Sequence, residues 1–425
     1  MENKTTILDS GIVLNDIISD NFKTVSLAVE FYLPFDKRTA SYASLLSSVL
    51  RRGNARFGEM DKIGEFLDEN YGASLGISAS KRGDLQRFCI TAACIDDRFC
   101  LEGEPVLSNV MSLVEATLFS PMLENGGFKA SFVEQEKRNL KDYIAALIND
   151  KRLYSLERCK QTMFADDVYG AYEHGDPEEI DKITPASLYE FMRNMLDNSM
   201  LFISYAGASR DTFAFFSGVL QKLDIGKRPV FKTAIDNTPR EVNTVIEPMS
   251  VAQSKLNIGF RMGNAAMADP FAARVFNAVY GGTATSKLFA NVRERLSLCY
   301  YCASNVDYQK NVMFVYSGIE TENYEKARDE ILAQLELVKK GDFTDEELAD
   351  AKASLVDSYV QIGDSLGSLI AHRVSGELLG ISLSREEQIE QIKSITRERV
   401  IAIAQDITAD TVYLLKGIGG EGDAE

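Results

Sequence analysis

Histidine and cysteine set the first limits on the chemistry open to this chain of 425 residues. Its two histidines, His174 in an expected surface loop and His372 on an expected long helix, lie far apart in the sequence, whereas histidine is the commonest metal ligand and general base near neutral pH. Cys299 and Cys302 form a Cys-x-x-Cys pair, a spacing that redox proteins use at helix starts. Here the pair leads from an expected helix into an expected strand, where positions i and i+3 face opposite sides. We therefore expect neither a catalytic histidine nor a redox pair.

The charge of the chain limits its partners. Lys and Arg number 46 against 63 Asp and Glu, a formal net charge of −17, and this balance argues against binding to nucleic acid or to an anionic membrane, which requires clustered positive charge. The N-terminal segment has no basic stretch followed by an apolar one, and no run approaches about 18 consecutive apolar residues. We therefore expect a soluble cytoplasmic protein whose six cysteines are reduced.

The helices and strands that would position a functional site occur in two copies along the chain. The segment TVSLAVEFYLPF at 24–35 alternates apolar residues as a half-buried strand does, and SKLNIGFRM at 254–262 does the same. One offset of 229 residues places Leu27 on Leu256, and also Gly53 on Gly282, where each glycine closes an expected helix. This recurrence in register indicates a duplicated unit.

Further landmarks recur in the same order, at offsets that shrink from 224 to 212 as loop deletions would produce. They are Ala79-Ser80 on Ala303-Ser304, the capping box Ser131-x-x-Glu134 on Thr344-x-x-Glu347, and Ile183-Thr184 on Ile395-Thr396. Each half is therefore expected to be an α+β unit, a mainly antiparallel sheet with helices on one face.

Residues 225–240 carry two prolines, mixed charge and no amphipathic period, as an exposed linker does. We therefore predict an N-terminal half at 1–224 and a C-terminal half at 241–425.

The duplicated unit and two local motifs resemble the insulinase, pitrilysin and mitochondrial processing peptidase family of zinc peptidases. One motif is the helix that ends in Arg-Gly-Asn at 52–54, and the other is VRERLSLCY at 292–300. The resemblance covers nearly the whole chain and implies two tandem homologous α/β-sandwich halves with the processing-peptidase-like metallohydrolase fold. It also implies that Arg293 and Tyr300 contact the backbone of a peptide substrate, as donors to its carbonyl oxygens.

Without the resemblance, the better explanation is that Arg293 is a solvated helix charge and Tyr300 a half-buried strand aromatic. The positions at the same offset in the first half are Glu69 and Gly76, so the repeat itself does not require the pair.

The zinc motif of the family is missing. Active members carry His-x-x-Glu-His on the first helix of the first half, and the resemblance places Ser44, Ser47 and Ser48 at those positions. The third ligand, a glutamate on a later helix, is Tyr143 here. Because a serine hydroxyl is a poor zinc ligand and cannot replace the glutamate as a base, we expect no metal and no other cofactor.

The chain is similar in particular to the YmfF-like group, which is associated with the aminopentanol modification of elongation factor P. The resemblance implies a catalytically inactive bacterial homologue that forms a heterodimer with an active zinc-bearing relative and contributes peptide contacts to a shared chamber. Two hypotheses stay open beside it. One is a non-enzymatic homodimeric scaffold that binds a polypeptide, and the other is an autonomous hydrolase with a relocated site.

Overall fold

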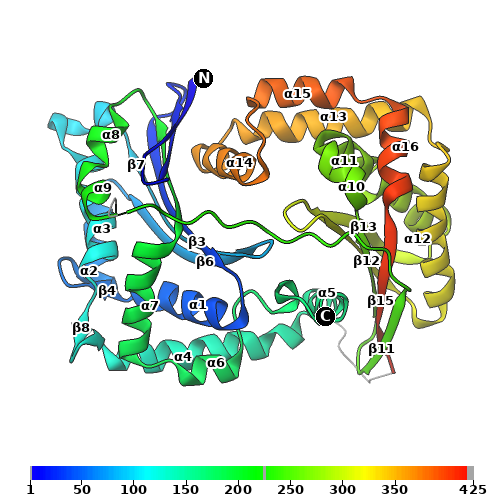
Figure 1. The fold of residues 1–425 in the computed structure, drawn as a ribbon, viewed down its shortest axis with the longest axis horizontal. Helices are drawn as coiled ribbons and strands as arrows, with labels where there is room; N and C mark the ends of the chain where they lie inside the picture. Colours follow the sequence, from blue (N-terminus) through cyan, green and yellow to red (C-terminus); the bar gives the residue numbers. More distant parts are fainter. Residues whose placement is uncertain (1, 224–225, 419–425) are drawn as a thin grey trace. The chain divides into compact units, whose positions relative to one another are not determined.

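The computed structural model describes residues 2–223 and 226–418 (Figure 1), so residue 225, the first of the predicted linker, lies outside the described part. Contacts divide the chain into two compact units, and neither is continuous in sequence. The first unit comprises 1–145, 171–232 and 362–381, and the second comprises 146–170, 233–361 and 382–425. Each unit thus holds one segment that the repeat places in the other half. The predicted halves at 1–224 and 241–425 describe the repeat in the sequence, and these boundaries stay a prediction.

The first unit is built on a mainly antiparallel sheet with the strand order β1-β2-β10-β3-β7-β6. β10 pairs with β2 in parallel, whereas the other neighbours pair antiparallel. The strands are β1 (Glu2–Ile7), β2 (Val13–Ile18), β3 (Thr24–Pro34), β6 (Ser74–Arg82), β7 (Leu85–Ile95) and β10 (Met200–Gly207). Two short ribbons join β4 (Gly53–Asn54) to β5 (Gly58–Glu59) and β8 (Leu123–Glu124) to β9 (Gly127–Phe128).

Helices from the N-terminal half cover one face of this sheet, as predicted, whereas the cover on its other face was not predicted. Apolar side chains of β3 point alternately into a core that they share with α1, α3 and α7. The helices of the unit are α1 (Lys37–Arg51), α2 (Met60–Glu69), α3 (Val106–Phe119), α4 (Ala130–Ala146), α6 (Pro177–Lys182), α7 (Pro185–Asn198), α8 (Thr212–Phe215), α9 (Ser217–Leu223) and α14 (Leu366–Leu379). α14 adds cover on the opposite face, where Leu369 and Ile370 pack with Tyr32 and Phe202. That face carries large apolar side chains of its own, and they require burial.

The second unit repeats the same scheme. Its sheet has the order β11-β15-β12-β14-β13, and β11 and β15 form the parallel pair, as β2 and β10 do in the first unit. The strands are β11 (Asn243–Met249), β12 (Ser254–Arg261), β13 (Cys299–Asp307), β14 (Val312–Ile319) and β15 (Thr408–Gly417). Five strands in one order with one set of directions confirm the duplication that the sequence indicates.

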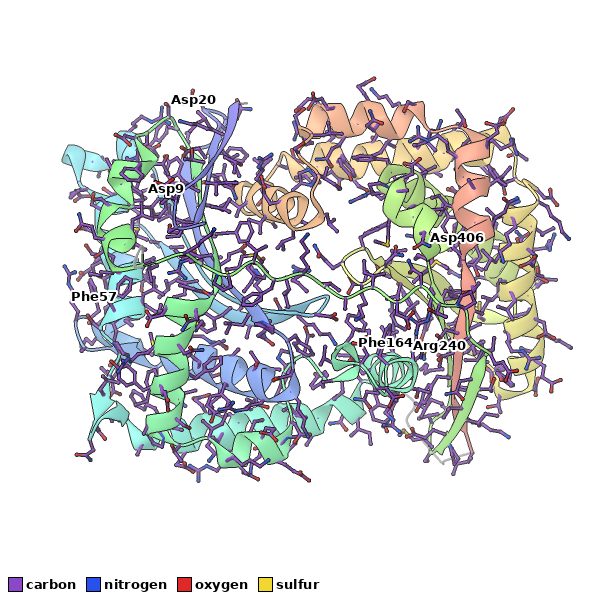
Figure 2. The ribbon with its side chains drawn as sticks, in the orientation of Figure 1. Asp9, Asp20, Phe57, Phe164, Arg240 and Asp406 are labelled. Atoms are coloured by element: carbon purple, nitrogen blue, oxygen red, sulfur yellow. The ribbon has the colours of Figure 1, made fainter. Side chains whose placement is uncertain are left out.

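The helices of the second unit also lie on both faces of its sheet. They are α5 (Lys151–Met163), α10 (Gly263–Ala268), α11 (Pro270–Asn277), α12 (Tyr324–Lys339), α13 (Asp345–Ile362), α15 (Arg385–Ser394), α16 (Arg397–Asp406) and the π-helices η5 (Ala278–Gly282) and η6 (Leu288–Arg295). α5 packs its Cys159 and Met163 against Phe314. Phe164 directly follows α5 (Figure 2), and its ring meets Tyr169 edge-on at 4.8 Å between centroids. Among the helices of the described ranges, none is long and apolar enough to cross a membrane.

The helix starts that the repeat places in register can be checked one by one. Thr184 caps α7 and Thr396 caps α16, each with its side-chain oxygen accepting a backbone N–H. Thr344 forms the predicted capping box with Glu347. Ser131 already lies inside the first turn of α4, which begins at Ala130, so the predicted cap position is two residues late there.

The predicted linker has neither helix nor strand in its described part, but the expectation that it is exposed is wrong at Arg228. This side chain is 4% exposed. Its guanidinium donates to the carbonyl oxygens of Leu196 at 2.8 Å and Leu223 at 2.6 Å. Both carbonyls belong to the last turns of helices, which leave acceptors without helical partners.

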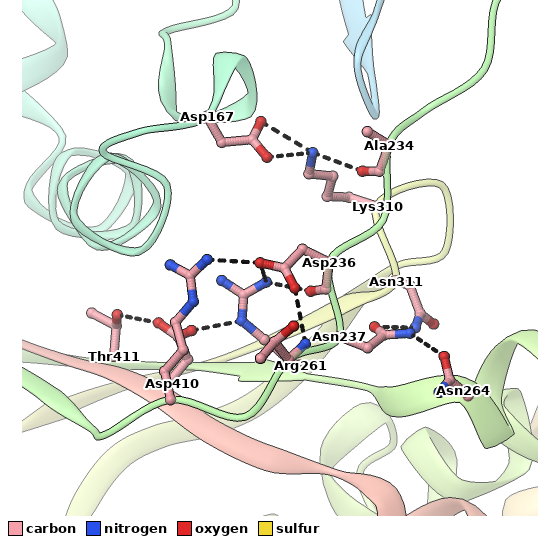
Figure 3. Close-up of polar contacts among 12 residues, drawn as sticks. Asp167, Ala234, Asp236, Asn237, Arg261, Asn264, Lys310, Asn311, Asp410 and Thr411 are labelled. Atoms are coloured by element: carbon pink, nitrogen blue, oxygen red, sulfur yellow. Dashed lines mark hydrogen bonds and ion pairs between the residues drawn. The ribbon is translucent and has the colours of Figure 1, made fainter.

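The later part of the linker is held in the second unit by polar contacts (Figure 3). Lys310 donates through Nζ to the carbonyl oxygen of Ala234 at 3.0 Å, and also to Asp167 at 2.9 Å. Asn311 donates through Nδ2 to Oδ1 of Asn237 at 2.9 Å. The segment therefore lies in fixed contact with the hairpin between β13 and β14.

Candidate functional site

The positions of the family's zinc motif lie on α1 and turn their hydroxyls inward. Ser47 donates through Oγ to the carbonyl oxygen of Ser44 at 2.8 Å, and Ser48 donates to the same oxygen at 3.4 Å. Ser44 is 4% exposed, and its own Oγ has no hydrogen-bond partner. These hydroxyls thus bond to their own helix or to nothing, and they offer no anionic or imidazole ligand.

The fourth position, Tyr143, lies on α4 and is exposed. Its ring meets His174 edge-on at 5.1 Å between centroids. His174 lies in a loop, as predicted, and His372 lies on α14. Within the described residues, no three His, Cys, Asp or Glu side chains converge as ligands of a metal ion. The residues at this place therefore do not fit zinc.

The second motif lies in a backbone with several local irregularities. Arg293 belongs to the π-helix η6, in which the N–H of Leu296 reaches the carbonyl of Asn291 at 3.1 Å. Ser297 follows with φ of 49°, a left-handed conformation that costs energy for a residue other than glycine. The pairing of β13 with β14 then shifts between Cys299 and Tyr301, so that Tyr300 is the extra residue of a β-bulge. Such irregularities concentrate at functional sites, because they redirect side chains.

Arg293 and Tyr300 line one cavity of about 450 Å³, within the size range of ligand pockets. The other lining residues are Glu294, Ser297, Leu298, Cys299, Glu320 and Asn323. The structure thus brings together the two residues that the resemblance singles out as substrate contacts. Their role stays a prediction.

Both side chains have partners in this cavity. Tyr300 is 62% exposed, and its hydroxyl donates to Oε1 of Glu320 at 2.8 Å. This hydrogen bond, together with the negative charge of Glu320, raises the pKa of Tyr300. The guanidinium of Arg293 lies over the ring of Phe289 at 4.7 Å, with Nε 3.4 Å from Glu294. Two carboxylates and one guanidinium line the cavity, so it favours a cationic ligand group.

Two features of the site escape sequence reasoning. Glu320 was missed, although it directly follows β14, whose pairing with β13 brings it to Tyr300. The expectation that Cys299 and Cys302 face opposite sides is wrong because of the bulge. Cys299 pairs with Ile319 and Cys302 with Ser317, and positions two apart on β14 share a face.

Known proteins resemble this chain in sequence. Residues 182–355 match the family model described as the peptidase M16 inactive domain. Over 413 residues the chain is 30% identical to the Bacillus subtilis protein named "probable inactive metalloprotease YmfF", and the match covers 96% of this chain and 97% of YmfF. The chain belongs to the peptidase M16 family. Within this insulinase-like family it is an inactive metalloprotease homologue, in agreement with the serines on α1.

Solved structures extend the M16 assignment to the fold. A conserved protein from Enterococcus faecalis V583 superposes with a TM-score of 0.89 at 28% identity, covering 99% of this chain and 100% of the other. A peptidase M16 inactive domain from Pseudomonas fluorescens superposes with a TM-score of 0.80 at 16% identity over the full length of both chains. The predicted α+β architecture with two homologous halves is thereby confirmed.

Proposed function

We propose that this inactive M16 homologue pairs with an active, zinc-bearing relative and supplies Arg293 and Tyr300 as contacts for a peptide in a chamber formed with that partner. One contrast within the chain carries the proposal. The α1 positions carry no zinc ligand, and Ser44 and Ser47 are buried, while Arg293 and Tyr300 are exposed beside one cavity. A chain with substrate contacts but no metal ligands requires a second chain for hydrolysis.

The chemistry of the cavity suits an extended peptide. A guanidinium has five N–H donors and a phenol has one, and the carbonyl oxygens of a peptide are acceptors for both. On binding, a carbonyl would take the Tyr300 hydroxyl from Glu320, whose carboxylate then faces the peptide. Because Glu294 and Glu320 both line the cavity, peptides with Lys or Arg near the bound segment are the expected substrates.

The test is to co-express this chain with a zinc-bearing M16 relative from the same genome and to measure cleavage of a fluorogenic basic peptide. We expect Arg293→Ala to raise KM by about 10- to 100-fold, since hydrogen bonds from a charged donor contribute about 1.5–3 kcal/mol. Tyr300→Phe removes one neutral donor, and we expect an increase in KM of up to about tenfold. Arg295→Ala is the matched control, because Arg295 lies two positions away, is 62% exposed and faces Glu330 instead of the cavity.

The outcomes separate the hypotheses. Unchanged cleavage with both Arg293→Ala and Tyr300→Phe would contradict the proposal. A stable homodimer that does not bind the zinc-bearing chain, as measured by light scattering, would favour the scaffold hypothesis. Stoichiometric zinc in the purified chain would favour an autonomous hydrolase.

A further inference from the structure

The bulge in β13 places two thiols side by side. Cys302 lies opposite Ser317 and Cys299 lies opposite Ile319, and the side chains of all four residues are buried. Tyr300 is the extra residue between the two cysteines and points to solvent. Both thiols therefore lie on the inner face of the edge strand, although three positions separate them in the sequence.

The spacing of this pair suits a disulfide. Ile319 and Ser317, the partners of the two cysteines, lie two positions apart on β14. Two residues of an antiparallel strand span about 6.8 Å. Disulfides join Cα atoms that are about 4.4–6.8 Å apart. The span of about 6.8 Å lies at the upper end of this range.

The two thiols differ in access. Cys299 is 9% exposed and lines the cavity of about 450 Å³ that also holds Arg293. Cys302 is 3% exposed and does not line that cavity. A small oxidant can thus reach Cys299 from the cavity, and Cys302 lies behind it.

The environment of Cys299 also favours its thiolate. A hydrogen bond with the Cys302 thiol, with smaller contributions from Ser317 and the Arg293 guanidinium, lowers the pKa of Cys299. Burial acts in the opposite direction at Cys299 but is outweighed there, whereas it raises the pKa of Cys89 and Cys159 and brings that of Cys94 to about 12. Thiolates are the reactive form of cysteine.

We propose that Cys299 and Cys302 are a redox-active pair, in which a peroxide oxidises Cys299 and Cys302 then closes a disulfide across the bulge. The Cys299 thiolate attacks one oxygen of the peroxide, the O–O bond breaks, and hydroxide leaves and becomes water. Sulfur thereby loses two electrons and becomes a sulfenic acid. The Cys302 sulfur attacks that sulfur, the S–O bond breaks, and the leaving hydroxide takes the Cys302 proton. Two thiols and one hydrogen peroxide give one disulfide and two waters, and thiol reductants reverse the disulfide. This inference does not depend on the proposed peptide binding.

The test uses the full chain with Cys100→Ser, because Cys100 is a partly exposed thiol outside the pair. The folded protein is treated with hydrogen peroxide, alkylated, digested with trypsin and analysed by mass spectrometry. Cleavage after Arg295 and Lys310 gives a peptide, residues 296–310, whose cysteines are Cys299 and Cys302. We expect this peptide to lose the mass of two hydrogens, and its alkylation to fall by about tenfold or more until dithiothreitol is added.

Single variants assign the two roles. With Cys302→Ser, the sulfenic acid at Cys299 has no resolving thiol, and we expect dimedone to trap it. With Cys299→Ser, we expect Cys302 to stay reduced at the same peroxide concentration. Absence of the disulfide in the Cys100→Ser chain, or equal oxidation of Cys302 when Cys299 is replaced, would overturn the proposal.

Discussion

The edge strands β6 and β13 occupy the same place in the two sheets, but they differ in backbone and in surface. β6 pairs with β7 in an unbroken register, and a Cβ on its Gly76 would lie 2.6 Å from Oγ1 of Thr91. β13 has Tyr300 at the corresponding position, extruded by a bulge. The duplicated fold thus tolerates a local change at one edge, and that change creates a cavity without altering the strand order.

The centres of the two sheets differ in a similar way. The repeat places Tyr32 of β3 on Arg261 of β12. Tyr32 donates to Glu30 at 3.3 Å, whereas Arg261 is 2% exposed and donates to Asp410 at 2.7 Å (Figure 3). Both sheets thus hold a buried ion pair, but Tyr32 is a neutral donor to the carboxylate of the Arg87–Glu30 pair, whereas Arg261 is itself the cation of its pair, and substitutions at the two positions are expected to differ in effect.

The largest expected effect is at the buried pair of Arg261 and Asp410. Arg261→Met leaves Asp410, 6% exposed, as a buried carboxylate without its cation, and we expect a loss of about 3–5 kcal/mol in the free energy of unfolding. Tyr32→Phe in the first sheet removes one hydrogen bond and is expected to cost about 1 kcal/mol. Urea unfolding measures both, and Arg240→Met, on a half-exposed arginine, is the control. Equal losses for Arg261→Met and Tyr32→Phe would contradict the difference between the sheets.

The next effect is at the edge strands. Gly76→Val forces a side chain against Thr91, and we expect a destabilisation of about 1–3 kcal/mol. Tyr300→Val in β13 replaces an exposed side chain. We expect it to change the free energy of unfolding by about 0.5 kcal/mol or less. Thermal unfolding of the two variants compares the edges directly. A stable Gly76→Val chain would mean that β6 also has room for a bulge.

Two smaller effects on stability, of opposite sign, are expected in the turns before these strands. Gly72 has φ of 68° with open space around it, and Ser297 has φ of 49°. We expect Gly72→Ser to destabilise the protein by about 1 kcal/mol and Ser297→Gly to stabilise it by about 0.5–1 kcal/mol. The midpoints of denaturant curves report both signs. The same sign for both variants would rule out backbone strain as the cause.

The smallest expected effect concerns the pH dependence of Cys299. Because its pKa is lowered, its thiolate is already present below the usual thiol pKa of about 8.5. Its alkylation rate should therefore rise at lower pH than that of a free thiol. Cys302→Ala removes the hydrogen bond that lowers the pKa, so the curve should move to higher pH. The rate of iodoacetamide labelling of peptide 296–310 across pH measures this shift, and an unmoved curve would assign the lowering to Ser317 and Arg293 instead.

Sequence reasoning reached the parts of the site that local signals encode. The capping box at Thr344 and Glu347 was placed correctly, since capping depends on a few adjacent residues. Arg293 and Tyr300 were found through a contiguous motif. Glu320 and the bulge were missed, because strand register is a property of a pair of strands and not of either one.

The amino-acid sequence by itself determined the duplication, the α+β class and the absence of zinc ligands on α1, because apolar alternation, capping and residue identity are local. Tertiary structure decided which segments complete each unit and which side chains of the edge strand β13 are buried or exposed. α5 and α14 each join the unit that the repeat does not assign to them, since their apolar side chains pack against the sheet of that unit. The shared face of Cys299 and Cys302 depends on one extra residue in the pairing with β14. Long-range contact, rather than local propensity, set both outcomes.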